Sequence, residues 1–292
     1  MKRVLFLFIT LLFLTGCSTQ APNADIAATT LPVWEFTSRL CQETPLTITR
    51  LVTEEVSCLH DYSLNVRQVK AAEAADLIVI SGAGLEAFLE DLLLDTAIVD
   101  ASEEIDLLCP EETHDHGHEH EGHHHESDPH IWLSPVNAVS MARNICSGLS
   151  QAYPQYREIF HSNLEILEAD LAALQAYGSA QLQNLSCRDL ITFHDGFAYF
   201  ADSFDLHILE AVEEESGSEA SAKELIHLIE EVEHHNLPAV FTEKSGSVSA
   251  ASIIARETGS GSFQLDMAMA GDSYLMPCTT ISIPSRRHLD EI

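Results

Sequence analysis

Residues 155–182, QYREIFHSNLEILEADLAALQAYGSAQL, decide how the rest of the chain is organised. Five apolar side chains in this stretch follow one another at intervals of four, three, four and three residues: Phe160, Leu164, Leu167, Leu171 and Leu174. That spacing predicts one apolar stripe along a helix of about seven turns. A helix of this length exceeds the ordinary element of a globular domain, so we expect a rigid connection between two lobes.

Short apolar runs alternate with helical patterns on both sides of this helix. Before it we expect strands at 25–31, 46–53, 76–81 and 97–100, and helices at 32–43, 64–75, 85–94 and 135–149. After it we expect strands at 188–193, 239–243 and 262–266, and helices at 196–205, 221–235 and 249–259. Such alternation predicts α/β lobes with parallel sheets. We place the lobes at 25–137 and 185–275, with a helical connection at 138–184.

The overall charge limits the possible partners. The 292 residues carry a net charge of −32 and include 16 histidines. Nucleic acids and anionic membrane surfaces are bound through Lys and Arg, so neither is an expected partner. An acidic surface attracts cations.

The N-terminus has the pattern of an export signal. Residues 1–16 combine a charged start with an apolar run too short to span a bilayer as a helix, which indicates a signal peptide. The sequence LTGC at 14–17 resembles a bacterial lipobox, which predicts a lipidated Cys17, a tether at 17–24 and an extracytoplasmic protein anchored to the cell membrane. An ordinary signal peptide with a chance cysteine is the alternative. The six other cysteines permit fifteen disulfide pairings, and the sequence does not choose among them.

Half of the histidines lie between positions 114 and 130. Residues 113–127 have no hydrophobic period, so a disordered loop is expected there. Its histidines are candidate accessory metal ligands: His114, His116, His118, His120, His123, His124 and His125. The GAGLE motif at 82–86 follows a strand but lacks the third glycine of a dinucleotide fingerprint, so we interpret it as a strand-to-helix turn.

Three histidines lie where a ligand site is expected. His60 and His194 follow predicted strands, and His130 stands at the border between the loop and the next helix. Glu243 and Asp266 end two further strands. Ligands bind outside the carboxyl ends of the strands in open α/β sheets, and three imidazoles with a carboxylate or water make a tetrahedral zinc site. We assign the remaining histidines to helix surfaces or loops: His161, His207, His227, His234, His235 and His288.

Four motifs resemble one protein family in the same order. They are LHDYSLN (59–65), DPHIWLSP (128–135), ITFHDGFAYFADSFDL (191–206) and the segment from FTEKSGS to QLD (241–266). Together they are similar to the zinc/manganese-type solute-binding lipoproteins of bacterial ABC importers. The resemblance implies two Rossmann-like lobes joined by a long rigid helix, a metal in the interlobe cleft, and docking to a membrane permease. We expect a monomer.

The resemblance also implies roles for particular residues. It makes His60, His130 and His194 metal ligands, Asp266 the carboxylate of the fourth position, and Glu243 a hydrogen-bonding group behind the ligands. A histidine at position 194 resembles the zinc branch, and imidazole favours zinc over manganese. Water in place of Asp266 stays open as the fourth ligand. The family usually has proline before its first ligand, where this chain has Leu59.

The end of the chain departs from the family pattern. Residues 276–292 have two prolines and no helical period. One choice of codons, read in a shifted frame, restores an amphipathic helix, so we interpret this tail as the product of a single-base deletion near Leu275.

These patterns support one function above its alternatives. The first is a high-affinity Zn²⁺-binding protein, not an enzyme, that delivers metal to an importer. The alternatives are a manganese-binding member of the same family, a zinc-dependent hydrolase, and a surface protein for metal storage or adhesion. A hydrolase is disfavoured because the candidate ligands are spread over roughly 135 residues without a compact HExxH-type pair.

Overall fold

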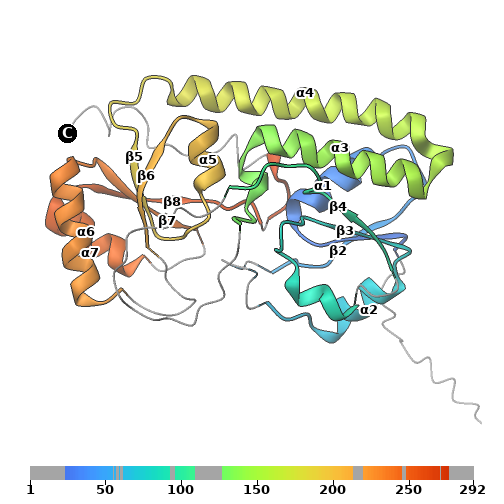
Figure 1. Ribbon diagram of the computed structural model, residues 1–292, viewed down its shortest axis with the longest axis horizontal. Helices are drawn as coiled ribbons and strands as arrows, with labels where there is room; N and C mark the ends of the chain where they lie inside the picture. Colours follow the sequence, from blue (N-terminus) through green and yellow to red (C-terminus); the bar gives the residue numbers. More distant parts are fainter. Residues whose placement is uncertain are drawn as a thin grey trace, which may run out of the picture.

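Two four-stranded parallel sheets form the centres of two lobes, and one long helix runs along both of them (Figure 1). The computed structural model describes residues 24–54, 56, 59, 62–92, 96–108, 127–212, 220–244, 248–269 and 271–275. Within these ranges, no helix is both long enough and apolar enough to cross a lipid bilayer.

The first lobe is a three-layer sandwich. Its strands are β1 (Ile26–Ala28), β2 (Ile48–Arg50), β3 (Leu77–Ile80) and β4 (Ala97–Asp100), in the order β2-β1-β3-β4. Helices α1 (Leu31–Leu40) and α3 (Pro135–Ala152) lie over one face of the sheet, whereas α2 (Val66–Ala74) and the 3₁₀ helix η1 (Ala87–Leu92) lie over the other. Successive strand residues point to opposite faces of the sheet. Apolar strand residues are buried on both faces, against α1 and α3 on one side and against α2 and η1 on the other.

The second lobe repeats this topology. Its strands are β5 (Asp189–Thr192), β6 (His207–Ala211), β7 (Ala239–Glu243) and β8 (Gly261–Leu265), in the order β6-β5-β7-β8. Helix α5 (Ala198–Ser203) follows β5, while α6 (Ala222–His235) and α7 (Ser249–Thr258) share a core with β5 and β7. Each sheet therefore has one point at which the direction of strand succession reverses, between β1 and β3 and between β5 and β7.

The long helix α4 (Arg157–Leu182) confirms the predicted connection. It has 26 residues, about 39 Å at 1.5 Å per residue, and it follows η2 (Ile131–Leu133), α3 and the 3₁₀ turn η3 (Pro154–Tyr156). Four residues of the predicted stripe are buried and Leu164 is partly buried. Near its start, the Asn163 amide donates to the carbonyls of Leu40 and Gln42 and so satisfies the end of α1. Near its end, a Cβ on Gly178 would collide with the Phe204 ring of the second lobe.

The chain crosses between the lobes a second time after β8. Met267, Ala268, Met269 and Tyr274 belong to the core of the first lobe. The Tyr274 ring lies edge-on against Phe36 with centroids 5.1 Å apart. The two lobes are thus connected by α4 and by this returning segment, of which residues 267–269 and 271–275 are described.

The predicted fold class is confirmed, and two local predictions are wrong. His207 begins strand β6 and is not a loop or helix residue. Residues 85–92 do not form the predicted α-helix: after positive φ angles at Gly82, Ala83 and Gly84, the described chain forms a turn and the short 3₁₀ helix η1. Cys41, Cys146 and Cys187 are free thiols, and burial raises the pKa of Cys41 to about 12.

Several predictions fall on residues that the structure does not describe. They are the signal peptide and Cys17, the loop histidines from His114 to His125, His60, and the tail at 276–292.

Candidate metal centre

In the first lobe, a buried side chain of the protein occupies the carboxyl edge of the sheet. Glu86, the last residue of the GAGLE motif, is buried at the reversal point between β1 and β3. Its carboxylate accepts from the Thr29 hydroxyl at 2.6 Å and from the backbone N–H groups of Ser81 and Gly82 at 2.7 and 3.0 Å. These are the donors that would otherwise face an anionic ligand, so the first sheet offers no phosphate site here.

Burial raises the pKa of Glu86 to about 7, although its three hydrogen bonds act in the opposite direction. In the unfolded chain the same carboxyl titrates at its ordinary value of 4.5. Between these two values the folded state holds a proton that the unfolded state has lost. The stability contributed by protonated Glu86 is therefore fully present below about pH 4.5 and is lost as the pH rises through 7.

The equivalent point of the second sheet carries an imidazole. His194 lies two residues after the end of β5 and Glu243 ends β7, so both lie at the reversal point of the second sheet. His194 Nδ1 lies 4.0 Å from Glu243 Oε2, and the exposed fractions of the two side chains are 15% and 8%. A Cβ on Gly196 would collide with the His194 ring. The small residue in the turn therefore allows this ring its position.

His130 reaches the same region from the first lobe. It immediately precedes η2, where Ile131 and Trp132 are fully buried and anchor the segment. Asp128 Oδ1 accepts from the His130 backbone N–H at 2.8 Å and lies 2.7 Å from His130 Nδ1. This contact favours the ring proton on Nδ1, so Nε2 is the nitrogen that faces His194 and would bind a metal. Asp128 was not singled out in the sequence, although its position two residues before His130 was visible there.

Contacts with the returning segment and with the second lobe hold the His130 segment in place. Trp132 Nε1 donates to the Met267 carbonyl at 2.8 Å, and the Tyr274 hydroxyl donates to the Trp132 carbonyl at 2.6 Å. From α5, the Tyr199 hydroxyl donates to the Asp128 carbonyl at 3.0 Å. The position of His130 therefore depends on groups from both lobes and on the returning segment.

The two imidazoles meet at the junction of the lobes. His130 Nε2 and His194 Nε2 lie 3.4 Å apart, and the two rings are nearly perpendicular at 86°. Two nitrogen ligands of one tetrahedral zinc ion, each about 2.0–2.1 Å from the metal, are separated by roughly 3.4 Å. The observed separation fits that edge of a zinc tetrahedron.

Of the two other predicted ligands, His60 lies outside the described residues and Asp266 has contacts of its own. Asp266 follows β8, and its Oδ2 lies 3.2 Å from Lys244 Nζ while its Oδ1 accepts from the Ala268 backbone N–H at 2.9 Å. Each Asp266 oxygen therefore already has one partner, and a metal would have to share the carboxylate with Lys244 and the Ala268 N–H. A groove of about 480 Å³ lies along β2 in the first lobe, between Trp34 and Asp272, and contains none of the predicted ligands.

The chain has two parallel-sheet lobes, one long helix that spans them, and an imidazole pair at their junction. These features are those of a two-lobed solute-binding protein for a metal ion. Comparison with known proteins places the chain within a family. Residues 26–278 match the model of ZnuA, zinc-uptake complex component A, periplasmic, and the chain belongs to this family. The family resemblance seen in the sequence is confirmed, and so is the prediction that the chain is not an enzyme, since this is a family of solute-binding proteins.

Individual relatives agree with this assignment. The zinc-binding lipoprotein AdcA of Streptococcus pneumoniae is 31% identical over 272 residues, which cover 89% of this chain and 54% of AdcA. The chain thus spans about half the length of the curated relatives that it matches first. The crystal structure of ZnuA has a TM-score of 0.73 at 27% identity, covering 89% of this chain and 98% of that one. A zinc-bound ZnuA deletion mutant has a TM-score of 0.71 at 28% identity, covering 89% and 97%.

Proposed function

We propose that this protein captures Zn²⁺ outside the cytoplasm and delivers it to the permease of an ABC importer. The observation that carries the proposal is the 3.4 Å separation of His130 Nε2 and His194 Nε2, which come from different lobes. Membership of the zinc-uptake family supports the transport role. The lipoprotein relative supports an extracytoplasmic, membrane-anchored location through Cys17.

The proposed ligand set is His60, His130 and His194, with Asp266 or water in the fourth position. Asp128 and Glu243 stand behind two of the imidazoles and would orient them, as carboxylates commonly do for zinc-bound histidines. A set dominated by imidazole favours zinc, whereas Mn²⁺ prefers oxygen ligands. The donor set therefore supports zinc over the manganese alternative.

The experiment is a competition titration of the mature chain with Zn²⁺, Mn²⁺ and a chelator, with bound metal measured by mass spectrometry. Structural zinc binding of about 10–16 kcal/mol spread over four ligands gives about 3 kcal/mol for each, so we expect His194→Ala to weaken Zn²⁺ binding by roughly 100-fold. His207→Ala is the matched control, because His207 is 71% exposed at the start of β6.

Two results would contradict the proposal. Tight binding that survives His194→Ala and His60→Ala but disappears when residues 113–126 are deleted would move the function to the loop and favour metal storage. Preferential loading with Mn²⁺ would instead assign the chain to the manganese-binding type.

A further inference from the structure

The last turn of α6 carries a second group of metal-binding side chains. Glu231, His234 and His235 each offer a donor atom, and these three atoms lie within 4.8 Å of one another. Within the described part of the chain, this is the one such group of three or more. Helix α6 lies at the end of the second lobe that is remote from the first lobe (Figure 1). The group is therefore separate from the pair formed by His130 and His194.

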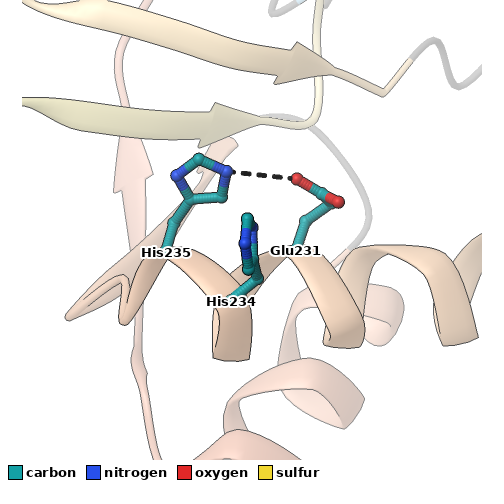
Figure 2. Close-up of side chains that lie close together, drawn as sticks. All are labelled: Glu231, His234 and His235. Atoms are coloured by element: carbon teal, nitrogen blue, oxygen red, sulfur yellow. Dashed lines mark ion pairs between the residues drawn. The ribbon is translucent and has the colours of Figure 1, made fainter.

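The geometry of the three side chains is close to that of a bound ion. His235 Nε2 lies 3.5 Å from Glu231 Oε2, near the roughly 3.4 Å edge of a zinc tetrahedron. Neighbouring residues of a helix diverge by about 100°, yet the rings of His234 and His235 approach to 4.7 Å between centroids. Figure 2 shows all three side chains on the same side of the helix, converging on one region.

The surroundings also favour a cation. The three residues lie in the last turn of α6, which ends at the left-handed Asn236 cap. The carboxyl end of a helix carries a partial negative charge that stabilises cations. Glu230 and Glu233 add acidic side chains to the same part of the helix. All three ligands are at least partly accessible, so the donors can close the remaining distance by small rotamer changes.

We propose that Glu231, His234 and His235 form a surface site for a divalent transition metal of the Zn²⁺ type. Two imidazoles with one carboxylate are the donor set of zinc sites that keep an open fourth position. With three ligands in contact with solvent, the site exchanges its ion readily and binds more weakly than the pair between the lobes. Mn²⁺ and Ca²⁺ prefer oxygen donors, so they bind to a site with two imidazoles more weakly than Zn²⁺ does.

The test is diethyl pyrocarbonate footprinting of the mature chain during titration with Zn²⁺, because mass spectrometry then reports each histidine separately. We expect His234 and His235 to become protected together at one micromolar-range concentration of Zn²⁺. His227 lies on the same helix with a 54% exposed side chain and serves as the internal reference that stays reactive. The same concentration of Mn²⁺ should leave His234 and His235 reactive.

Two substitutions on the same helix separate coordination from general charge. Glu231→Gln removes a ligand and should raise the half-protecting Zn²⁺ concentration about tenfold. Glu233→Gln removes the same charge from an exposed position outside the group, and it should change the half-protecting Zn²⁺ concentration less than twofold. Any of three results would overturn the proposal. The first is that Zn²⁺ protects His234 and His235 no more than it protects His227. The others are that the two substitutions have equal effects, or that Mn²⁺ protects the two histidines as well as Zn²⁺ does. Introducing His194→Ala tests independence, because it removes a proposed ligand between the lobes and should leave the α6 footprint unchanged.

Discussion

Asp128→Asn is the most direct test of how the structure prepares His130 for a metal. Asp128 Oδ1 lies 2.7 Å from His130 Nδ1, and the exposed fractions of the His130 and Asp128 side chains are 2% and 10%. Asp128 Oδ2 is buried and makes no hydrogen bond with any described residue. An amide of the same shape therefore keeps the packing but removes the negative charge. In the wild type, that charge stabilises the Nδ1–H tautomer of His130 and makes Nε2 a better ligand.

The expected effect follows from this arrangement. Loss of a carboxylate behind a metal-bound histidine weakens metal binding by about 10–100-fold, which corresponds to about 1.4–2.7 kcal/mol. We expect the lower part of the range if the asparagine oxygen still accepts from the ring. The upper part is expected if the amide nitrogen faces Nδ1 and reverses the tautomer.

The assay is chelator competition for Zn²⁺ at neutral pH, with circular dichroism to confirm folding. Asp76→Asn is the matched control, since Asp76 is exposed at the amino end of β3, the opposite edge of the sheet from the histidines. If Asp128→Asn binds Zn²⁺ within twofold of Asp76→Asn, the orientation of His130 by Asp128 does not contribute to binding and this reasoning is refuted.

Two further predictions concern stability, measured as the free energy of unfolding in urea. The free energy of unfolding of the wild type, measured relative to that of Glu86→Gln, should fall by about 2 kcal/mol between about pH 5 and pH 7. The reason is that only the wild type carries the buried carboxyl whose pKa is raised. A stability difference between the two proteins that does not change with pH would contradict this prediction. Trp132→Phe removes the donor to the buried Met267 carbonyl and should cost about 1–3 kcal/mol. Trp34→Phe is the comparison at a partly exposed indole, and equal stability of the two variants would show that the hydrogen bond from Trp132 to the returning segment is dispensable.

The parts of the fold that were predictable are those with a local cause. Helix α4 followed from the spacing of its apolar stripe, and the buried strands β3 and β7 followed from continuous apolar runs. Strand β6 was missed because it is an edge strand whose residues are exposed or only partly buried, so its sequence HILEA lacks clear alternation. The identical strand order of the two lobes has no counterpart in any visible sequence repeat.

The candidate site shows the same division. The placement of His130 and His194 was predictable because strand ends and helix starts are local features, and the structure brings these two residues together. The ion pair of Asp266 with Lys244 joins two strand ends and could not be foreseen from spacing alone. The convergence of His234 and His235 was missed for a related reason, since adjacent helix positions normally point apart.

The returning segment after β8 has a consequence for the synthesis of the chain. Met267 and Tyr274 complete a core whose other members begin at Ile26. As the polypeptide emerges in order, the first lobe exposes an unfilled apolar face until nearly 250 later residues have followed. Contacts so distant in sequence form late and slowly. The lobe that is made first is consequently finished last, and a chain interrupted before Met267 would leave the core of the first lobe incomplete.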